Sequence, residues 1–373
     1  MTSGPTTYPV ADMHCDTVQR LMQGMVLSER NDIGHVDLPR LIEGGVQIQV
    51  FACFLEPKIP PHRRQSTIDT MLDCLERTFE THSDSIEIAL NSGDIEQITD
   101  SGRIAAILAI ENGEGINGSL ETLAHYHRRG VRLMTLTHNV SSDWCIASAD
   151  TRPAFMGLSD LGRDIVRAMD ELGMIIDVSH ASEASVSAVL ETTRNPIVAS
   201  HSCVRALCDF HRNLTDEQIR SIAAQGGMIG VNFCCDFLSQ ASLEASGAVI
   251  TADWDRYRRW EEFFSGWFTA EEYARQRTKL MPFLREWERA IRETGVSVRH
   301  VADHIDYIVN LAGPEHVGIG SDFDGISLAP KDIEDCSKLP NLVDELKRRG
   351  YSDTQLGHIL RGNFVRLFKT VCG

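Results

Sequence analysis

The amino-acid sequence predicts an α/β protein, a (β/α)₈ barrel of the TIM type. Short apolar runs rich in β-branched residues alternate with amphipathic segments over about 320 residues, and eight such runs can be counted. Several of these runs stop at a histidine or a carboxylate, and the carboxyl ends of parallel barrel strands converge on one mouth. We therefore expect a single domain, residues 1–373, with its functional residues at that mouth.

The expected elements follow in alternation along the chain. Strands are expected at residues 8–14, 46–55, 103–110, 131–137, 173–180, 195–201, 228–233 and 316–321. Helices are expected at residues 66–90, 119–129, 181–194, 215–225, 341–349 and 352–370. The helix at 215–225 has a capping signal at Thr215. Two strands separated by one helix end at His180 and His201, which places both imidazoles on one edge of the sheet.

One segment, residues 252–297, breaks this alternation between the seventh and eighth strands. It is charged and aromatic, with Trp254, Tyr257, Trp260, Phe264, Trp267, Phe268 and Trp287. The spacing of several of these aromatic residues predicts a helical insertion near the mouth of the barrel. A substrate-facing lid is one interpretation. A helix packed on the barrel wall, or a subunit interface, is at least as well supported.

Composition excludes several classes of protein. A chain of 373 residues with 42% hydrophobic residues can bury a large core. The formal net charge of -17 opposes binding to nucleic acid and to anionic membrane surfaces. The first residues lack the charged and apolar regions of a signal peptide, and no run approaches the roughly 20 apolar residues of a membrane span. We therefore expect a soluble, cytoplasmic protein without a nucleic-acid or membrane partner.

The ten cysteines are spread along the chain without a C-x-x-C pair. In a long chain without a secretion signal, such cysteines are expected to be reduced thiols. Most are expected to serve as small buried apolar residues, and a thiolate metal site is disfavoured.

Polar side chains gather where the expected strands end. Seven residues lie at or just beyond those ends: His14, Asp16, Glu111, His138, His180, His201 and Asp322. Imidazole and carboxylate groups are ligands for borderline metal ions such as Zn²⁺. Alternate residues of a strand point to the same side, so His14 and Asp16 can face one ion together. The pattern predicts a site for one or two metal ions.

Each of these residues alone has an ordinary structural explanation. A histidine at a strand end can be capped or hydrogen-bonded, and Glu111 can neutralise a helix end. Seven residues on five or more strand ends would each need a separate explanation of this kind. Their coincidence favours the metal site.

Eight motifs together carry a resemblance to a known family. They are His14-Cys-Asp-Thr, Ala109-Ile-Glu-Asn-Gly, Leu136-Thr-His, Asp177-Val-Ser-His, Ala199-Ser-His-Ser, His211-Arg-Asn-Leu, Gly318-Ile-Gly-Ser-Asp-Phe-Asp-Gly and Gly362-Asn-Phe-Val-Arg-Leu. In this order they resemble the renal (membrane) dipeptidase family of zinc peptidases, within the amidohydrolase superfamily, over about residues 8–369.

The resemblance implies a binuclear zinc site. His14 and Asp16 match ligands of one ion, His180 and His201 match ligands of the other, and Glu111 matches the carboxylate that bridges both. The residue matching His138 polarises the scissile carbonyl, the one matching Arg212 binds the terminal carboxylate of the substrate, and the one matching Asp322 shuttles the proton.

The chain departs from the family pattern at two places. The family often has Glu-Gly-Gly where this chain has Glu111-Asn112-Gly113, and the aromatic insertion is longer than in mammalian members. Mammalian members are secreted and lipid-anchored, whereas this chain resembles a bacterial-type cytoplasmic relative. The family often forms dimers, so the resemblance is compatible with a homodimer, but the sequence itself does not give the oligomeric state.

The resemblance implies a zinc-dependent dipeptidase that accepts L-Xaa-D-Xaa as well as L-Xaa-L-Xaa substrates. Water bound between two ions about 3.5–4 Å apart, with its pKa lowered to about 7, is the expected nucleophile. Asp322 would take its proton, and His138 would donate to the oxyanion. Arg212 offers a bidentate fork for a free carboxylate, although an ordinary surface salt bridge is its simpler explanation.

Two alternatives to a dipeptidase remain. One is an amidohydrolase acting on another small amide or lactam. The other is a non-catalytic barrel that uses metal for stability or ligand binding. Asp322 and His138 favour catalysis, because a purely structural site needs neither a spare base nor an oxyanion donor.

Overall fold

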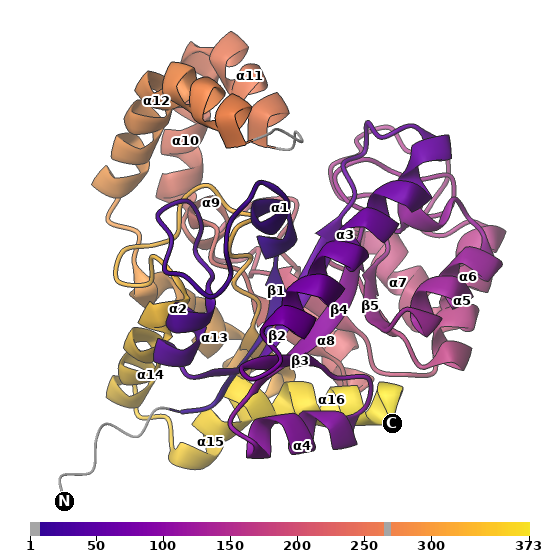
Figure 1. The fold of residues 1–373 in the computed structure, drawn as a ribbon. Coiled ribbons are helices and arrows are strands. Elements are labelled where there is room, and N and C mark those ends of the chain that lie inside the picture. The colour runs from indigo at the N-terminus through magenta and orange to yellow at the C-terminus, as the bar shows by residue number, and fades with distance from the viewer. Residues whose placement is uncertain (1–7, 265–269) are drawn as a thin grey trace, which may run out of the picture.

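The computed structural model describes residues 8–264 and 270–373 (Figure 1). All strand pairs of its sheet are parallel, in the order β2-β1-β9-β8-β7-β6-β5-β4-β3, and a further pairing of β2 with β4 closes the sheet. Eight strands therefore form a closed barrel, and the ninth, β3, pairs only with β4 outside it. The expected (β/α)₈ barrel is confirmed.

The strands of the described chain are β1 (Val10–Cys15), β2 (Val46–Phe54), β3 (Ile86–Ile88), β4 (Ile104–Glu111), β5 (Val131–Thr135), β6 (Ile175–Asp177), β7 (Val198–Ser202), β8 (Met228–Val231) and β9 (Val317–Ile319). The helices up to β8 are α1 (Thr17–Met22), α2 (Leu38–Glu43), α3 (Pro61–Thr81), α4 (Ser92–Asp100), η1 (Gly113–Ile116), α5 (Leu120–Arg128), α6 (Asp160–Leu172), α7 (Glu183–Thr192) and α8 (Asp216–Ala224). The helices after β8 are α9 (Cys235–Leu238), α10 (Gln240–Ala252), α11 (Trp254–Phe264), α12 (Ala270–Glu293), α13 (Val298–Ala312), η2 (Pro314–His316), η3 (Cys336–Lys338), α14 (Leu339–Arg348), α15 (Asp353–Gly357), η4 (His358–Gly362) and α16 (Asn363–Cys372).

The hydrophobic core has two parts, one inside the barrel and one between the strands and the surrounding helices, because barrel strands bury both faces. Every residue of β4 is buried, as expected for a strand with the barrel interior on one side and helices on the other. Side chains such as Met13, Ile107 and Leu133 fill the interior, and Phe364 and Phe368 of α16 belong to the same cluster. Helix α16 thus closes the amino end of the barrel (Figure 1), which leaves the carboxyl end as the accessible face.

Local sequence signals explain where helices begin. The Thr215 side chain accepts a hydrogen bond from the Gln218 backbone, and the Gln218 side chain accepts one from the Thr215 backbone. This capping box satisfies two backbone groups at the start of α8, as the sequence predicts. Ser182 caps α7 in the simpler way, by accepting from the Ser185 N–H.

The prediction of a helix at residues 66–90 is wrong about where the helix ends. Helix α3 ends at Thr81, and residues 86–88 form strand β3 paired with Ile104–Ala106. Ile86 and Ile88 flank Glu87, which is the alternation of a short strand, and the backbone of β4 provides a partner for it.

The insertion between β8 and β9 is helical, as expected, but starts earlier than residue 252. Helices α9 and α10 precede the expected segment, and α11 and α12 lie within it. Trp267 and Phe268 fall outside the described residues. In Figure 1, α10–α12 stand on the same side of the barrel as α1, which follows the carboxyl end of β1. Within the described chain, we find no helix whose length and apolar character would allow it to cross a membrane.

Candidate metal centre

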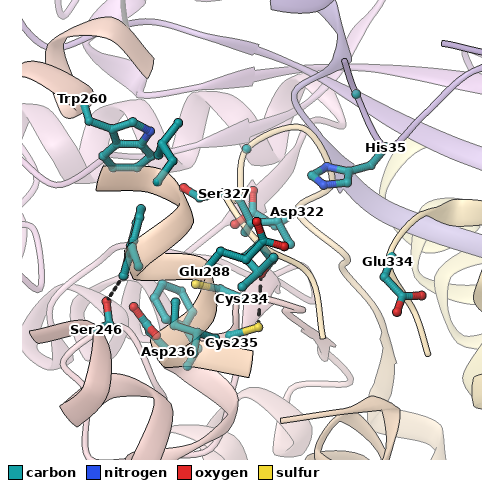
Figure 2. A pocket seen from close by; sticks show the side chains of 18 of the residues that line it. His35, Cys234, Cys235, Asp236, Ser246, Trp260, Glu288, Asp322, Ser327 and Glu334 are labelled. Carbon is teal, nitrogen blue, oxygen red and sulfur yellow. Dashed lines mark hydrogen bonds between the residues drawn. The ribbon is translucent and has the colours of Figure 1, made fainter. Parts of the chain in front are cut away.

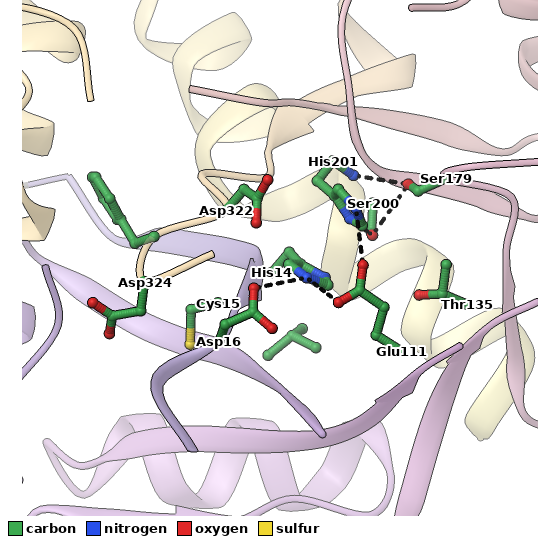
Figure 3. Close-up of polar contacts among 12 residues, drawn as sticks. His14, Cys15, Asp16, Glu111, Thr135, Ser179, Ser200, His201, Asp322 and Asp324 are labelled. Atoms are coloured by element: carbon green, nitrogen blue, oxygen red, sulfur yellow. Dashed lines mark hydrogen bonds and ion pairs between the residues drawn. The ribbon is translucent and has the colours of Figure 1, made fainter. Parts of the chain in front are cut away.

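Five of the predicted ligands meet at the carboxyl end of the barrel, and Figure 3 shows four of them: His14, Asp16, Glu111 and His201. His14 lies in β1 with Asp16 just after it, Glu111 ends β4, His180 follows β6, and His201 lies in β7. All five are buried. Short parallel strands in a closed barrel bring residues that are far apart in sequence to one place.

Glu111 is at the centre of this group. Its Oε1 lies 3.1 Å from His180 Nε2 and 3.5 Å from His201 Nε2, whereas its Oε2 lies 3.6 Å from His14 Nε2. His14 Nε2 is in turn 3.5 Å from Asp16 Oδ2. The two oxygens of one carboxylate therefore face two different sets of donors.

The imidazoles of His180 and His201 are held with their Nε2 atoms facing inward. Asn139 Oδ1 lies 2.8 Å from His180 Nδ1, and an amide oxygen accepts, so Nδ1 carries the hydrogen. Ser200 Oγ donates to Asp177 at 2.7 Å and lies 2.7 Å from His201 Nδ1, from which it accepts. The two unprotonated Nε2 atoms then lie only 3.0 Å apart. Two lone pairs and a carboxylate in this arrangement suit a bound cation.

Buried polar atoms without hydrogen-bond partners also indicate a metal site. His14 Nδ1 and Nε2 and Asp16 Oδ1 are buried without a hydrogen-bond partner in the described part of the chain. Buried polar groups are nearly always paired, so these atoms fit a metal ion well. Among the described residues, three groups have ligand atoms within 4.8 Å of one another: His14, Asp16 and Glu111; Glu111, His138 and His180; and His14, Asp177 and His201.

The proton affinities follow from burial and from the carboxylates. Burial lowers the pKa of His180 well below its ordinary value and that of His201 to about 3, so both rings are neutral and able to bind metal. Burial also opposes charge on His14, but Glu111 and Asp16 raise the pKa of His14 well above its usual range. A metal ion binding at His14 therefore displaces a proton.

Three further predicted residues line one cavity together with Glu111 and His180: His138, Arg212 and Asp322. The His138 ring packs against Phe54 and His180, with ring centroids 4.6 and 4.2 Å apart, and burial lowers its pKa to about 4. Its Nδ1 is a buried atom without a partner among the described residues. A neutral imidazole with an unused nitrogen can donate to, or accept from, a bound molecule.

Arg212 is buried, so the explanation as a surface salt bridge is wrong. Its NH2 donates to the His201 carbonyl at 3.3 Å, its guanidinium carbon lies 5.5 Å from the centre of the Phe237 ring, and its Nε is unpartnered within the described chain. A buried guanidinium with unused donors, next to a cavity, fits a carboxylate ligand.

Asp322 is held in an unusual conformation beside the metal-binding residues. Its backbone φ is 61°, in the left-handed region that non-glycine residues rarely adopt. The Asn232 amide donates to its Oδ2 at 2.8 Å. Burial, with the nearby charges of Asp16 and Glu111, raises the pKa of Asp322 to about 8. A carboxyl group with such a pKa can both accept and donate a proton near neutral pH.

All eight predicted site residues thus lie together, but four supporting residues were not predicted: Asp177, Ser200, Asn139 and Asn232. A signal existed for Asp177, because a carboxylate inside a buried strand has no packing explanation. The other three are ordinary polar residues whose contacts arise only from the tertiary fold.

A parallel barrel with clustered histidines and carboxylates at its mouth is typical of a metal-dependent hydrolase. The sequence profile described as membrane dipeptidase (peptidase family M19) matches residues 5–372. The chain therefore belongs to the membrane dipeptidase family, and it is a metallopeptidase of the dipeptidase class.

Individual relatives agree with this assignment. Dipeptidase aclJ of Aspergillus oryzae is 31% identical over 346 residues, which cover 91% of this chain and 70% of the relative. Dipeptidase 3 of Rattus norvegicus is 26% identical over 375 residues, covering 98% of this chain and 65% of the relative.

Solved structures are similar along nearly the whole chain. The probable dipeptidase PvdM from Pseudomonas aeruginosa has a TM-score of 0.81 at 25% identity, covering 98% of this chain and 95% of that one. A metallopeptidase from Rhodobacter sphaeroides, liganded with a phosphinate mimic of the dipeptide L-Ala-D-Ala, has a TM-score of 0.78 at 23% identity, covering 98% and 99%.

Proposed function

We propose that this protein is a binuclear zinc dipeptidase that hydrolyses L-Xaa-L-Xaa and L-Xaa-D-Xaa dipeptides. The observation that carries the proposal is the position of Glu111, whose Oε1 faces His180 and His201 while its Oε2 faces His14. A carboxylate so placed would bridge two ions, one held with His14 and Asp16 and the other with His180 and His201. Imidazole nitrogen and carboxylate oxygen donors of this kind suit Zn²⁺.

The two zinc ions, when bound, supply polarisation of the scissile carbonyl and activation of the attacking water. Asp322 accepts a proton from that water at its carboxylate and passes it to the nitrogen of the leaving amine. The pKa of Asp322, raised to about 8 by burial, suits a group that must take and then release a proton. The bond that breaks is the peptide C–N bond, and the products are two free amino acids.

His138 and Arg212 hold the substrate. His138 donates a hydrogen bond to the carbonyl oxygen as negative charge develops there, which lowers the barrier most when water is excluded. The buried Arg212 guanidinium binds the free α-carboxylate. A fixed distance between these two groups selects short substrates, because only a peptide with its carboxyl end one residue from the scissile bond engages both.

The experiment is hydrolysis of L-Ala-D-Ala by the zinc-loaded protein, with Asp322→Asn measured beside it. Likeness to the peptidase liganded with a mimic of that dipeptide supports the choice of substrate. We expect clear turnover in the wild type and a loss of about 10²-fold or more in kcat for Asp322→Asn. Asn is isosteric, so metal content should stay at two ions per chain. No turnover by a fully loaded wild type would refute the proposal.

A further inference from the structure

One continuous cavity of about 930 Å³ connects the candidate metal centre to the inserted helices (Figure 2). Its lining includes Glu111, His138, Arg212 and Asp322, residues of α10, α11 and α12, and polar residues such as Asp32, His35 and Glu334. Pockets for drug-sized ligands have volumes of about 300–1,000 Å³, so this cavity is near the upper end. It is much larger than a dipeptide with small side chains requires.

The lining residues of the inserted helices form two stripes. On α10 they are Leu243, Ser246, Gly247 and Ile250, and on α12 they are Met281, Leu284, Trp287, Glu288 and Ile291. Spacings of three, four and seven residues place side chains on one face of a helix. Each helix therefore presents a largely apolar face to the cavity. We call these two faces, with Tyr257 and Trp260 of α11, the apolar wall.

Trp287 and Glu288 of the apolar wall both have polar partners. Trp287 Nε1 donates to Ser246 Oγ at 2.7 Å, and the Trp287 ring lies 4.8 Å from Trp260 and 6.4 Å from Tyr257 between centroids. Glu288 is exposed, and its Oε1 lies 3.8 Å from Arg292 Nε. A rigid aromatic cluster with its indole N–H satisfied offers apolar contact rather than hydrogen bonds.

Gly247 leaves open space in the middle of this wall. It lies within α10, where glycine costs about 1 kcal/mol relative to alanine. Gly247 is exposed, and a Cβ atom built there would meet no atom of the described residues within 4 Å, so no described neighbour requires a glycine. Because Gly247 also lines the cavity, the space beside it is available to a ligand.

We propose that the apolar wall receives a large apolar side chain of the substrate, so that the preferred dipeptides carry Leu, Phe or a similar residue. The inference rests on the proposed function. The half-buried side chains of Leu243, Ile250 and Leu284 would lose their remaining water on contact with such a group. Burying one leucine or phenylalanine side chain is worth a rise of about tenfold or more in kcat/KM.

The test compares kcat/KM for two series, L-Xaa-L-Ala and L-Ala-L-Xaa, with Ala, Leu and Phe as Xaa. We expect Leu and Phe to exceed Ala by about tenfold or more in one series, which also identifies the substrate residue that meets the wall. In Gly247→Leu, whose side chain would fill the space, we expect this ratio to fall towards one.

Gly357→Leu is the matched control. It places the same side chain at a helical glycine with equally open surroundings, in α15, away from the cavity. Its preference ratio should match the wild type. A wild-type ratio near one in both series, or a ratio unchanged in Gly247→Leu, would overturn the inference while dipeptidase activity stood. No hydrolysis of any dipeptide, including L-Ala-L-Ala, would overturn the proposed function and the inference with it.

Discussion

Ser200 is bonded twice to Asp177, with its backbone N–H at 2.9 Å from Oδ1 and its hydroxyl at 2.7 Å from Oδ2. Ser321 is bonded to Asp12 in the same way, at 2.9 and 2.6 Å. Both pairs join neighbouring strand ends of the barrel. Both hydroxyls also touch a predicted metal ligand, but in different ways. Ser200 Oγ lies 2.7 Å from Nδ1 of the His201 ring, whereas Ser321 Oγ donates to the backbone carbonyl of His14 at 3.3 Å.

Ser200→Ala should weaken zinc binding by about 10- to 100-fold, because the hydrogen bond that orients His201 is lost. Ser321→Ala removes the equivalent hydroxyl without touching a ligand ring and should keep wild-type affinity. Each variant should lose about 1–3 kcal/mol of stability. Competition with a chelator measures the affinity of each. Equal loss of affinity in both variants would show that Ser200 acts only through the fold.

Asn232→Ala should move the acid limb of the kcat/KM profile to higher pH. The Asn232 amide stabilises the charged form of Asp322, so its removal raises the pKa of Asp322 further. The base form is then lost at a higher pH as acid is added. Gln49→Ala, which removes another buried barrel amide that does not contact Asp322, is the control. Profiles that shift equally in both variants would argue against a specific effect on Asp322.

Removal of metal should lower the melting temperature by about 5–10 °C, because a ligand that binds only the folded state stabilises it. Differential scanning calorimetry before and after chelation, and after zinc is restored, measures the effect. In Glu111→Gln, the negative charge that faces both donor sets is lost, so added zinc should raise the melting temperature little. An apo protein as stable as the loaded one would contradict a metal site at these buried residues.

Stability should also fall in mild acid because of His304, which is not among the predicted metal ligands. Its Nδ1 accepts from the Val204 N–H and its Nε2 donates to the Leu238 carbonyl, and burial lowers its pKa to about 4. Between pH 6.5 and about 4 the unfolded chain binds a proton that the folded chain does not, so the free energy of unfolding decreases as pH falls.

The contribution of His304 to this loss is at most about 3 kcal/mol. His304→Gln lacks the titrating ring, so its unfolding free energy, from denaturant titrations across this pH range, should fall less steeply than that of the wild type. Parallel curves for the two proteins would rule out His304 as a source of the acid sensitivity.

Much of the fold and site was predictable because the same short segments show both the apolar run of a buried strand and the polar site residue at its end. The run Met174–Val178 is apolar enough to identify a buried strand, and it leads directly to His180. Strand β3 was not predictable, because its three residues continue an amphipathic region and become a strand only when β4 is beside them.

The supporting residues Asn139 and Asn232 could not be predicted for a related reason. Each follows a strand as an ordinary polar residue, and its role comes from a partner more than 40 positions away in the chain. The sequence also could not predict what the aromatic face of the insertion contacts. A lid, a helix packed on the barrel and a subunit interface all show the same helical spacing of aromatic residues.

The apolar wall and the candidate metal centre are encoded separately. The wall comes from one contiguous stretch, α10–α12, which leaves the barrel after β8 and returns before β9, and these two strands are neighbours. Lengthening a connection between fixed ends costs little free energy. If the apolar wall selects the substrate side chain as proposed, that preference can change through this one segment without any change in the candidate metal centre.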